Sequence, residues 1–299
     1  LLLGACKNGN ASSQNKSETS QDTIKAIKMP AIPQMMTAPE QRADFLAKHY
    51  WDNVNFADTN YIHHPEVTEQ AWADYCDLLN HVPLETAQQA MRNVIDRTNV
   101  DKKVFTYITD LADKYLYDPN SPMRNEEFYI PVLEAMIASP VLNETEKIRP
   151  QARLKLAQKN RIGTKALNFT YTLASGAQGS LYQLKAEYLL LFINNPGCQA
   201  CTETIEGLKN APIINQLLQE KKLVLLSIYP DEELDEWKKH LSEFPNEWIN
   251  GYDKKFTIKE EQVYDLKAIP TLYLLDKDKT VLLKDATAPA IEAYLMQHQ

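Results

Sequence analysis

Residues 189–201 read LLLFINNPGCQAC, a continuous apolar run followed by two cysteines with two residues between them. An uninterrupted apolar segment such as Leu189 to Ile193 is typical of a strand that is buried on both faces of a sheet. A helix predicted to begin at Cys198 brings Cys198 and Cys201 within disulfide reach over one turn. The stretch therefore predicts a dithiol between a buried strand and a helix.

The start of that helix predicts different roles for the two thiols. Unpaired backbone N–H groups and the helix dipole stabilise a thiolate at the first cysteine. We therefore expect Cys198 to be the exposed nucleophile that attacks a substrate disulfide. Cys201, one turn deeper, is expected to resolve the mixed disulfide that forms.

Strands and helices are predicted to alternate on both sides of this stretch. Further strands are predicted at residues 169–173, 223–228, 271–275 and 280–283. Further helices are predicted at residues 212–221, 231–244, 256–266 and from residue 289 onward. Such alternation is typical of a central mixed sheet with helices on both faces, so residues 161–299 are predicted to form an α/β domain.

Residues 38–160 carry helical periodicity interrupted by prolines, and they predict an all-α bundle of about six helices. Thr37-Ala38-Pro39-Glu40 has the pattern of a capping box with proline in the first turn. Asn143-Glu144-Thr145-Glu146 is predicted to open the last helix. The fold class predicted is therefore a helical N-terminal domain followed by an α/β domain.

Residues 1–6, LLLGAC, resemble the end of a secretory signal with a bacterial lipobox. Residues 7–37 begin with a polar Ser/Asn/Gln-rich segment and are predicted to form a flexible tether. On this interpretation Cys6 carries acyl chains that anchor the folded part to a bacterial membrane, outside the cytoplasm. We expect the periplasmic side of an outer membrane.

Composition excludes several classes of protein. The chain has 299 residues, 44% of them hydrophobic, and contains no apolar run near the ~20 residues that a membrane-spanning helix needs. Its net charge of -8 comes without a cluster of Lys and Arg, so we expect no nucleic-acid partner. Four cysteines are too few for a disulfide framework.

The two-cysteine motif also occurs in sites of other kinds. A structural zinc needs two further ligands, but no other cysteine follows residue 160, and His240 and His298 are not at ligand spacing. A haem attachment site needs His directly after the second cysteine, where this chain has Thr202. We therefore expect neither a metal nor a cofactor.

Residues 163–299 resemble the membrane-anchored, extracytoplasmic thioredoxin-like proteins of the TlpA/ResA type. The resemblance rests on the strand and the Cys198-Gln199-Ala200-Cys201 motif, and on three further stretches. These are the opening motif at residues 163–169, the short segment at 180–185, and the Ile-Pro-Thr loop within 265–274. The helical domain resembles, more loosely, that of uncharacterised Gram-negative lipoproteins.

This resemblance implies a thioredoxin fold and a thiol–disulfide oxidoreductase that acts reductively. It also implies that the Ile269–Pro270 peptide bond is cis and lies against the cysteines. In the family, the residue at Ile269 offers its backbone to a bound substrate strand, and the proline at Pro270 blocks metal capture.

The chain departs from the family pattern at three positions near the dithiol. Phe192 stands where thioredoxin has a buried Asp, Thr204 where the family has an active-site Glu, and Gly197 where it has an aromatic residue. The proton released during resolution then passes to water, to Glu203 as a proton relay, or to another group.

Two functions remain open from the sequence. The first is a membrane-anchored oxidoreductase that exchanges thiols with extracytoplasmic protein disulfides and receives electrons from a separate donor. The second is a redox-inert thioredoxin-like binding module whose helical domain recognises a partner. Cys198, Cys201 and Ile269-Pro270 favour the first, whereas Phe192 and Thr204 favour the second.

Overall fold

The structure is a computed structural model that describes residues 26–298. The expected lipidation site, Cys6, lies outside the described residues, as does most of the expected tether. Within residues 26–298, every helix is too short or too polar to cross a membrane.

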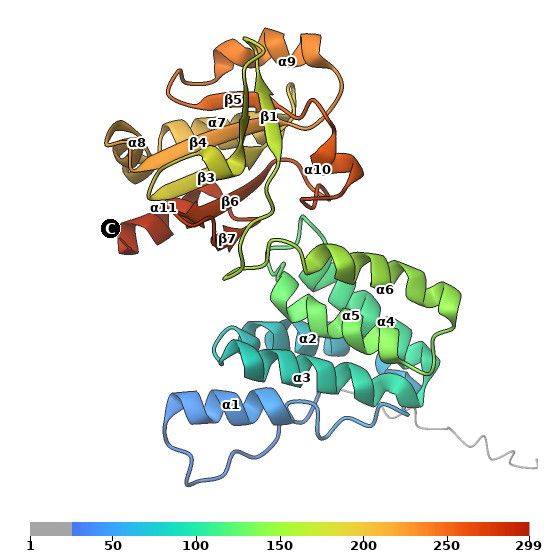
Figure 1. The fold of residues 1–299 in the computed structure, drawn as a ribbon. Coiled ribbons are helices and arrows are strands. Elements are labelled where there is room, and N and C mark those ends of the chain that lie inside the picture. The colour runs from blue at the N-terminus through green and yellow to red at the C-terminus, as the bar shows by residue number, and fades with distance from the viewer. Residues whose placement is uncertain (1–25, 299) are drawn as a thin grey trace, which may run out of the picture.

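The N-terminal domain is all-α, as the sequence predicts. Its six α-helices are α1 (Pro39–His49), α2 (Pro65–Leu79), α3 (Leu84–Arg97), α4 (Lys102–Ala112), α5 (Glu126–Ala138) and α6 (Glu144–Ala157). Short 3-10 turns lie at Thr59–His63 and Thr98–Val100, and a π-helical turn at Asp113–Tyr117 follows α4. Helices α1, α3, α5 and α6 stack in that order, with α6 nearest the second domain (Figure 1).

The predicted starts of the first and the last helix of this domain have different outcomes. The last helix of the domain, α6, opens at Asn143 as predicted, and Asn143 and Glu146 form a capping box there, each side chain bonding the other residue's backbone N–H. The predicted box at Thr37 is wrong, because the N-cap of α1 is Ala38, which makes no side-chain cap. Pro39 restricts the residue before it to extended backbone, so the helix can begin no earlier than Pro39.

The core of the helical domain is rich in aromatic rings. Trp51, Trp72 and Tyr75 are buried and lie with ring centroids 5.5–6.1 Å apart. Cys76, beside them on α2, is 2% exposed, and burial raises the pKa of its thiol to about 12. This cysteine is a small core residue.

The C-terminal domain is built on a seven-stranded mixed sheet of order β2-β1-β5-β4-β3-β6-β7. Its strands are β1 (Thr170–Leu173), β2 (Gln178–Ser180), β3 (Tyr188–Ile193), β4 (Leu223–Tyr229), β5 (Ile249–Tyr252), β6 (Thr271–Asp276) and β7 (Val281–Lys284). Strands β3, β4 and β5 are parallel, and β6 runs antiparallel to β3. The predicted buried strand, β3, is therefore in the interior of the sheet.

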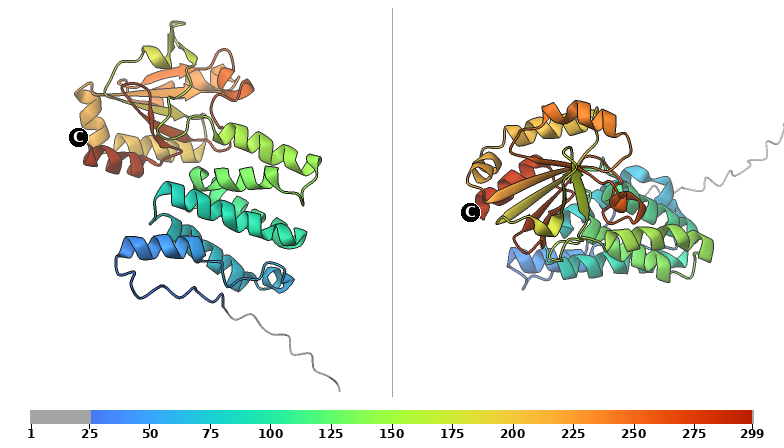
Figure 2. Two further views of the ribbon diagram at one scale, coloured as in Figure 1. Left: turned by 60° about the horizontal axis from the view of Figure 1, so that its bottom comes forward. Right: turned by 45° about the horizontal axis from the view of Figure 1, so that its top comes forward.

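Helices cover both faces of this sheet (Figure 2). The helices are α7 (Gln199–Lys209), α8 (Pro212–Gln219), α9 (Leu234–His240), α10 (Thr257–Glu260) and α11 (Ala288–Gln297), with 3-10 turns at Leu181–Gln183 and Leu241–Glu243. Helices α7, α8 and α11 pack on one face. Helix α10 and the turn Leu181–Gln183 pack on the other, so the predicted α/β architecture is confirmed.

Three elements differ from the sequence prediction. The helix predicted over residues 256–266 is only Thr257–Glu260, because Phe256 and Gln262 adopt left-handed backbone with φ of 53° and 50°. Strands β2 and β5 are absent from the prediction. In β5, Gly251 lacks a side chain and lies under the ring of Tyr171, so the strand has no apolar alternation to reveal it.

Candidate functional site

Cys198 is the N-cap of α7, so its thiol lies at the start of the helix as predicted. Its Sγ accepts a hydrogen bond from the backbone N–H of Cys201 at 3.3 Å. Cys198 is partly exposed, and Cys201 is only 2% exposed. The two thiols therefore have the predicted order, with the first at the surface and the second below it.

Both cysteines are free thiols in the structure. Burial raises the pKa of the Cys201 thiol to about 12, and its hydrogen bond with Cys198 adds to this effect. The backbone N–H of Asn195 acts in the opposite direction, because it can donate to the Cys201 thiolate. Cys201 is therefore a protonated thiol at neutral pH.

The Ile269–Pro270 loop lies directly against Cys198. The Ile269–Pro270 peptide bond is cis, as expected from the resemblance. The Cys198 thiol lies 3.8 Å from the carbonyl oxygen of Ile269, which it faces as a donor. The sheet brings together the loop that follows β3 and the loop that precedes β6, because Ile193 at the end of β3 pairs with Thr271 at the start of β6.

The positions where the family has acids hold other groups. Phe192 is fully buried and packs edge-on against Trp248, with ring centroids 6.4 Å apart. The hydroxyl of Thr204 donates to the carbonyl oxygen of Ala200 at 2.8 Å. Neither residue can accept the proton of Cys201.

Glu203 lies on the exposed side of α7. Its carboxylate accepts a hydrogen bond from the side-chain amide of Gln199 at 2.9 Å. It follows Cys201 by two positions, and residues at that spacing point to different sides of a helix. A proton could pass from Cys201 to Glu203 only through solvent.

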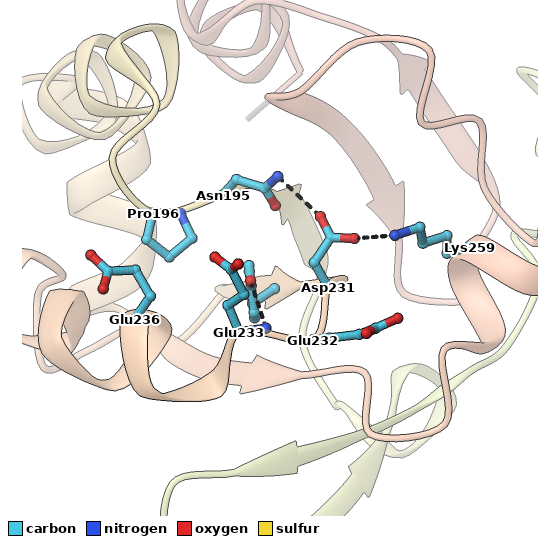
Figure 3. Close-up of a pocket in the computed structure, with 8 residues that line it drawn as sticks. Asn195, Pro196, Asp231, Glu232, Glu233, Glu236 and Lys259 are labelled. Atoms are coloured by element: carbon cyan, nitrogen blue, oxygen red, sulfur yellow. Dashed lines mark hydrogen bonds and ion pairs between the residues drawn. The ribbon is translucent and has the colours of Figure 1, made fainter.

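A groove of about 400 Å³ lies beside the loop that carries the dithiol (Figure 3). Asn195 and Pro196 form one side of the groove, and the acids that follow β4 form the other. Asp231 accepts hydrogen bonds from the Asn195 amide at 3.1 Å and from the Lys259 ammonium at 2.6 Å. Asp231 thereby ties the dithiol loop to α10.

None of the predicted site residues that the structure describes lines this groove. The sequence feature that could have pointed to the groove is the acidic run Asp231-Glu232-Glu233, directly after the buried strand 223–228. Because β3 and β4 are parallel neighbours, the loops at their carboxyl ends lie at the same edge of the sheet. The run could therefore have been expected near Cys198.

Comparison with known proteins agrees with the two-domain architecture. Residues 5–160 match a domain of unknown function, DUF5106, and residues 186–281 match a thioredoxin-like family. No curated protein matches the chain.

Among solved structures, a thioredoxin-like protein from Bacteroides caccae is 84% identical, with a TM-score of 0.90. The match covers 93% of this chain and 100% of that one. The C-terminal domain of an uncharacterized protein from Bacteroides fragilis is 69% identical over 46% of this chain and 98% of its own, with a TM-score of 0.45. The thioredoxin domain of a thiol–disulfide oxidoreductase from Bacteroides vulgatus is 20% identical over 46% and 97%, with a TM-score of 0.42.

The family expected from the sequence is thus confirmed, and so is the helical domain in front of it. The chain belongs to the thioredoxin-like proteins, and in it a helical DUF5106 domain precedes the thioredoxin-like domain.

Proposed function

We propose that the protein is a membrane-anchored thiol–disulfide oxidoreductase that reduces extracytoplasmic protein disulfides. One observation carries this proposal: the partly exposed thiol of Cys198 lies at the N-terminus of α7 and 3.8 Å from the carbonyl oxygen of Ile269. A thiol at that position can ionise and attack a disulfide that is presented beside it.

The reaction proceeds in two exchanges. The Cys198 thiolate attacks one sulfur of the substrate disulfide, the substrate S–S bond breaks, and the released sulfur takes up a proton. Cys201 then loses its proton and attacks Cys198 Sγ, which releases the second substrate thiol. The substrate gains two electrons and two protons, the chain is left with a Cys198–Cys201 disulfide, and an electron donor restores the dithiol.

The loop at Ile269 and Pro270 supplies the binding platform. A substrate strand that pairs with the backbone of Ile269 would place its disulfide next to Cys198 Sγ, since the carbonyl oxygen of Ile269 already lies beside that sulfur. Backbone pairing does not depend on the substrate's side chains, so it suits a reductase that acts on many proteins.

Glu203 is the acid that we propose as proton acceptor for Cys201, acting through solvent. Because it acts at a distance, replacing it with Gln should slow resolution by about two- to fivefold, well below the ~10²-fold loss for a direct general base. Glu206→Gln is a matched control on the same helix, where Glu206 pairs with Lys209 at 2.9 Å. Equal rates in the wild type and both variants would leave water as the acceptor.

Cys6 is the residue that we propose as the lipid anchor, on the strength of the LLLGAC sequence. Metabolic labelling with a radioactive or alkyne-bearing fatty acid in the native bacterium should modify the wild type and not Cys6→Ala. The variant should also leave the membrane fraction, and a membrane-bound, unlabelled wild type would contradict the assignment.

The decisive test is a redox titration combined with turnover. The Cys198/Cys201 potential is measured by equilibration with glutathione, and insulin disulfide reduction is measured for the wild type and Cys198→Ser. We expect turnover by the wild type only, and a mixed disulfide trapped by Cys201→Ser. A potential below about -300 mV without turnover would identify a structural disulfide and a redox-inert binding module instead.

A further inference from the structure

A buried cluster of charges joins the helical domain to the loop that carries Pro270. At its centre, the ammonium of Lys267 lies 2.7 Å from a carboxylate oxygen of Asp265, 3.3 Å from Glu126 and 3.5 Å from Asp285. Glu126 is the first residue of α5 in the helical domain, whereas Lys267 belongs to the same loop as Ile269 and Pro270.

Two further cations complete the cluster. Lys284 pairs with Glu126, and Arg124 donates to the carbonyl oxygen of Asp285 at 2.8 Å and lies 3.8 Å from its carboxylate. Three cations thus face three anions, and every one of the six side chains is at most 20% exposed. The charges balance, so the loss of one leaves another unpaired away from water.

The aromatic ring of Tyr117 supports the same lysine from the helical domain. The Lys267 ammonium lies 5.2 Å from the centre of this ring, and the guanidinium of Arg153 lies 4.0 Å from it. Tyr117 ends the π-helical turn Asp113–Tyr117 that follows α4. The helical domain therefore contacts Lys267 through both a carboxylate and an aromatic face.

The pKa values of Lys267 and Glu126 reflect the opposite charges that surround them in the cluster. Burial alone would lower the pKa of Lys267, but the carboxylates of Asp285, Glu126 and Asp265 raise it above its usual value. Burial raises the pKa of Glu126, and Lys284 and Lys267 oppose that rise. Lys267 is therefore charged at neutral pH and held from several sides.

The cluster is connected to the dithiol by a short series of contacts. The hydroxyl of Thr271 donates to a carboxylate oxygen of Asp285 at 2.7 Å. Thr271 follows Pro270 directly, and the carbonyl oxygen of Ile269 lies 3.8 Å from Cys198 Sγ. A shift of Lys267 or Asp285 would therefore displace the platform against which a substrate binds.

We propose that Glu126 and Lys267 are positioning residues for thiol–disulfide exchange: through them the helical domain fixes the Ile269–Pro270 platform relative to Cys198. This inference rests on the proposed function, and it gives the helical domain a part in the reaction of the other domain. Neither residue touches the reacting sulfur atoms, so both act through the loop.

Glu126→Gln tests the proposal in the full-length chain, since it removes the charge and keeps the shape. Its matched control is Glu127→Gln, because Glu127 is adjacent on α5 and similarly buried, but pairs with Arg161 and Gln88 away from the loop. We expect KM for insulin to rise about tenfold in Glu126→Gln, since small displacements of positioning groups have large effects. We expect no such change in Glu127→Gln.

Two further measurements distinguish a positioning role of Glu126 from a contribution to the stability of the fold alone. Alkylation of Cys198 by iodoacetamide should keep its wild-type rate in Glu126→Gln, because this small reagent does not use the platform. Amide hydrogen exchange over residues 265–273 should speed up in Glu126→Gln and in Lys267→Met, but not in Glu127→Gln. A lower unfolding midpoint with unchanged KM and loop exchange would overturn the proposal.

If the protein is not an oxidoreductase, the same experiments give a different set of results. A wild-type chain that reduces no insulin disulfide overturns the oxidoreductase proposal, and with it the role of Glu126 in a reaction. The exchange measurement then still decides whether the helical domain holds the loop, because it needs no turnover.

Discussion

Cys198 and Cys201 lie one helical turn apart but differ in exposure, and the roles that we propose for them rest on this difference. Cys198 caps α7 at the surface, whereas Cys201 is 2% exposed and has a pKa raised to about 12 by burial. At pH 8 a thiol with such a raised pKa stays protonated in nearly every molecule. These differences support our proposal that the first cysteine is the nucleophile that attacks an incoming disulfide.

Alkylation should reveal this difference directly. When the native chain is treated briefly with iodoacetamide at pH 8, we expect modification of Cys198 and none of Cys201 or Cys76, both of which have raised pKa values of about 12. In urea all three should react. Peptide mass spectrometry reports the modified positions, and equal labelling of Cys198 and Cys201 in the native chain would contradict the assignment.

The raised pKa of Cys201 also predicts how resolution depends on pH. The thiol stays protonated below its pKa, so its thiolate fraction, and with it the resolving rate, should rise about tenfold per pH unit between pH 6 and 9. Burial is the largest cause of the raised pKa of Cys201. We expect Cys201 to stay buried when Cys198 is in a mixed disulfide, so the same pH dependence should hold there. A mixed disulfide of Cys198 with thionitrobenzoate releases a coloured thiolate when Cys201 attacks, which measures the rate.

Cys201→Ser supplies the control for that experiment, since it should release no thionitrobenzoate at any pH. A rate in the wild type that is independent of pH over this range would mean that the Cys201 thiol is deprotonated by a nearby base. The proton path proposed through Glu203 and solvent would then need to be replaced by a direct acceptor.

At the scale of elements, the sequence predicted those features that form within a single helix or strand. The apolar run of β3 and the cysteine at the start of α7 could both be predicted, because burial and helix capping act over a few neighbouring residues. Strand β5 could not be predicted, since Ile249–Tyr252 contains Asn and Gly and forms only by pairing with β4 and β1.

Replacing Gly251 of β5 or Gly207 of α7 by alanine should change the stability of the protein in opposite directions. A Cβ at Gly251 in β5 would lie 2.9 Å from a ring carbon of Tyr171 and 3.3 Å from the backbone oxygen of Thr172. Gly251→Ala should therefore lower the free energy of unfolding by about 1–3 kcal/mol, as overpacking does. A Cβ at Gly207 in α7 would meet only Ala288, at 3.6 Å.

Gly207→Ala should accordingly raise the free energy of unfolding by about 0.5–1 kcal/mol, because alanine loses less backbone entropy than glycine in a helix interior. Urea unfolding followed by circular dichroism measures both changes. An equal loss of stability in the two variants would show that α7 does not tolerate the added methyl group and that Gly207 packs more tightly against α11 than a 3.6 Å contact allows.

At the scale of the whole molecule, the two domains meet where the loop of Pro270 is anchored. The sheet end at β7 lies nearest the helical domain (Figure 1), and Lys284 of β7 donates to the carbonyl oxygen of Lys159 at 2.9 Å. No pattern in the sequence linked Glu126 with Lys267, because their contact depends on how two separately folded units pack. The dithiol could therefore be predicted from sequence, but its connection to the helical domain could not.

A double-mutant cycle measures the strength of that connection. Glu126→Gln and Lys267→Met each leave one uncompensated charge in a cluster of three cations and three anions. Each single change should lower the free energy of unfolding by about 3–5 kcal/mol, as expected when one partner of a buried ion pair is removed.

The double variant restores the balance of charge at two cations and two anions. Its loss of stability should therefore be smaller than the sum of the single losses, by about 0.5–3 kcal/mol. Urea unfolding of the full-length chain gives all four free energies, and Glu127→Gln combined with Lys267→Met is the control, in which the losses should add. Additive losses in the Glu126 cycle as well would mean that the two residues do not interact, and that the helical domain and the Pro270 loop are held together by other contacts.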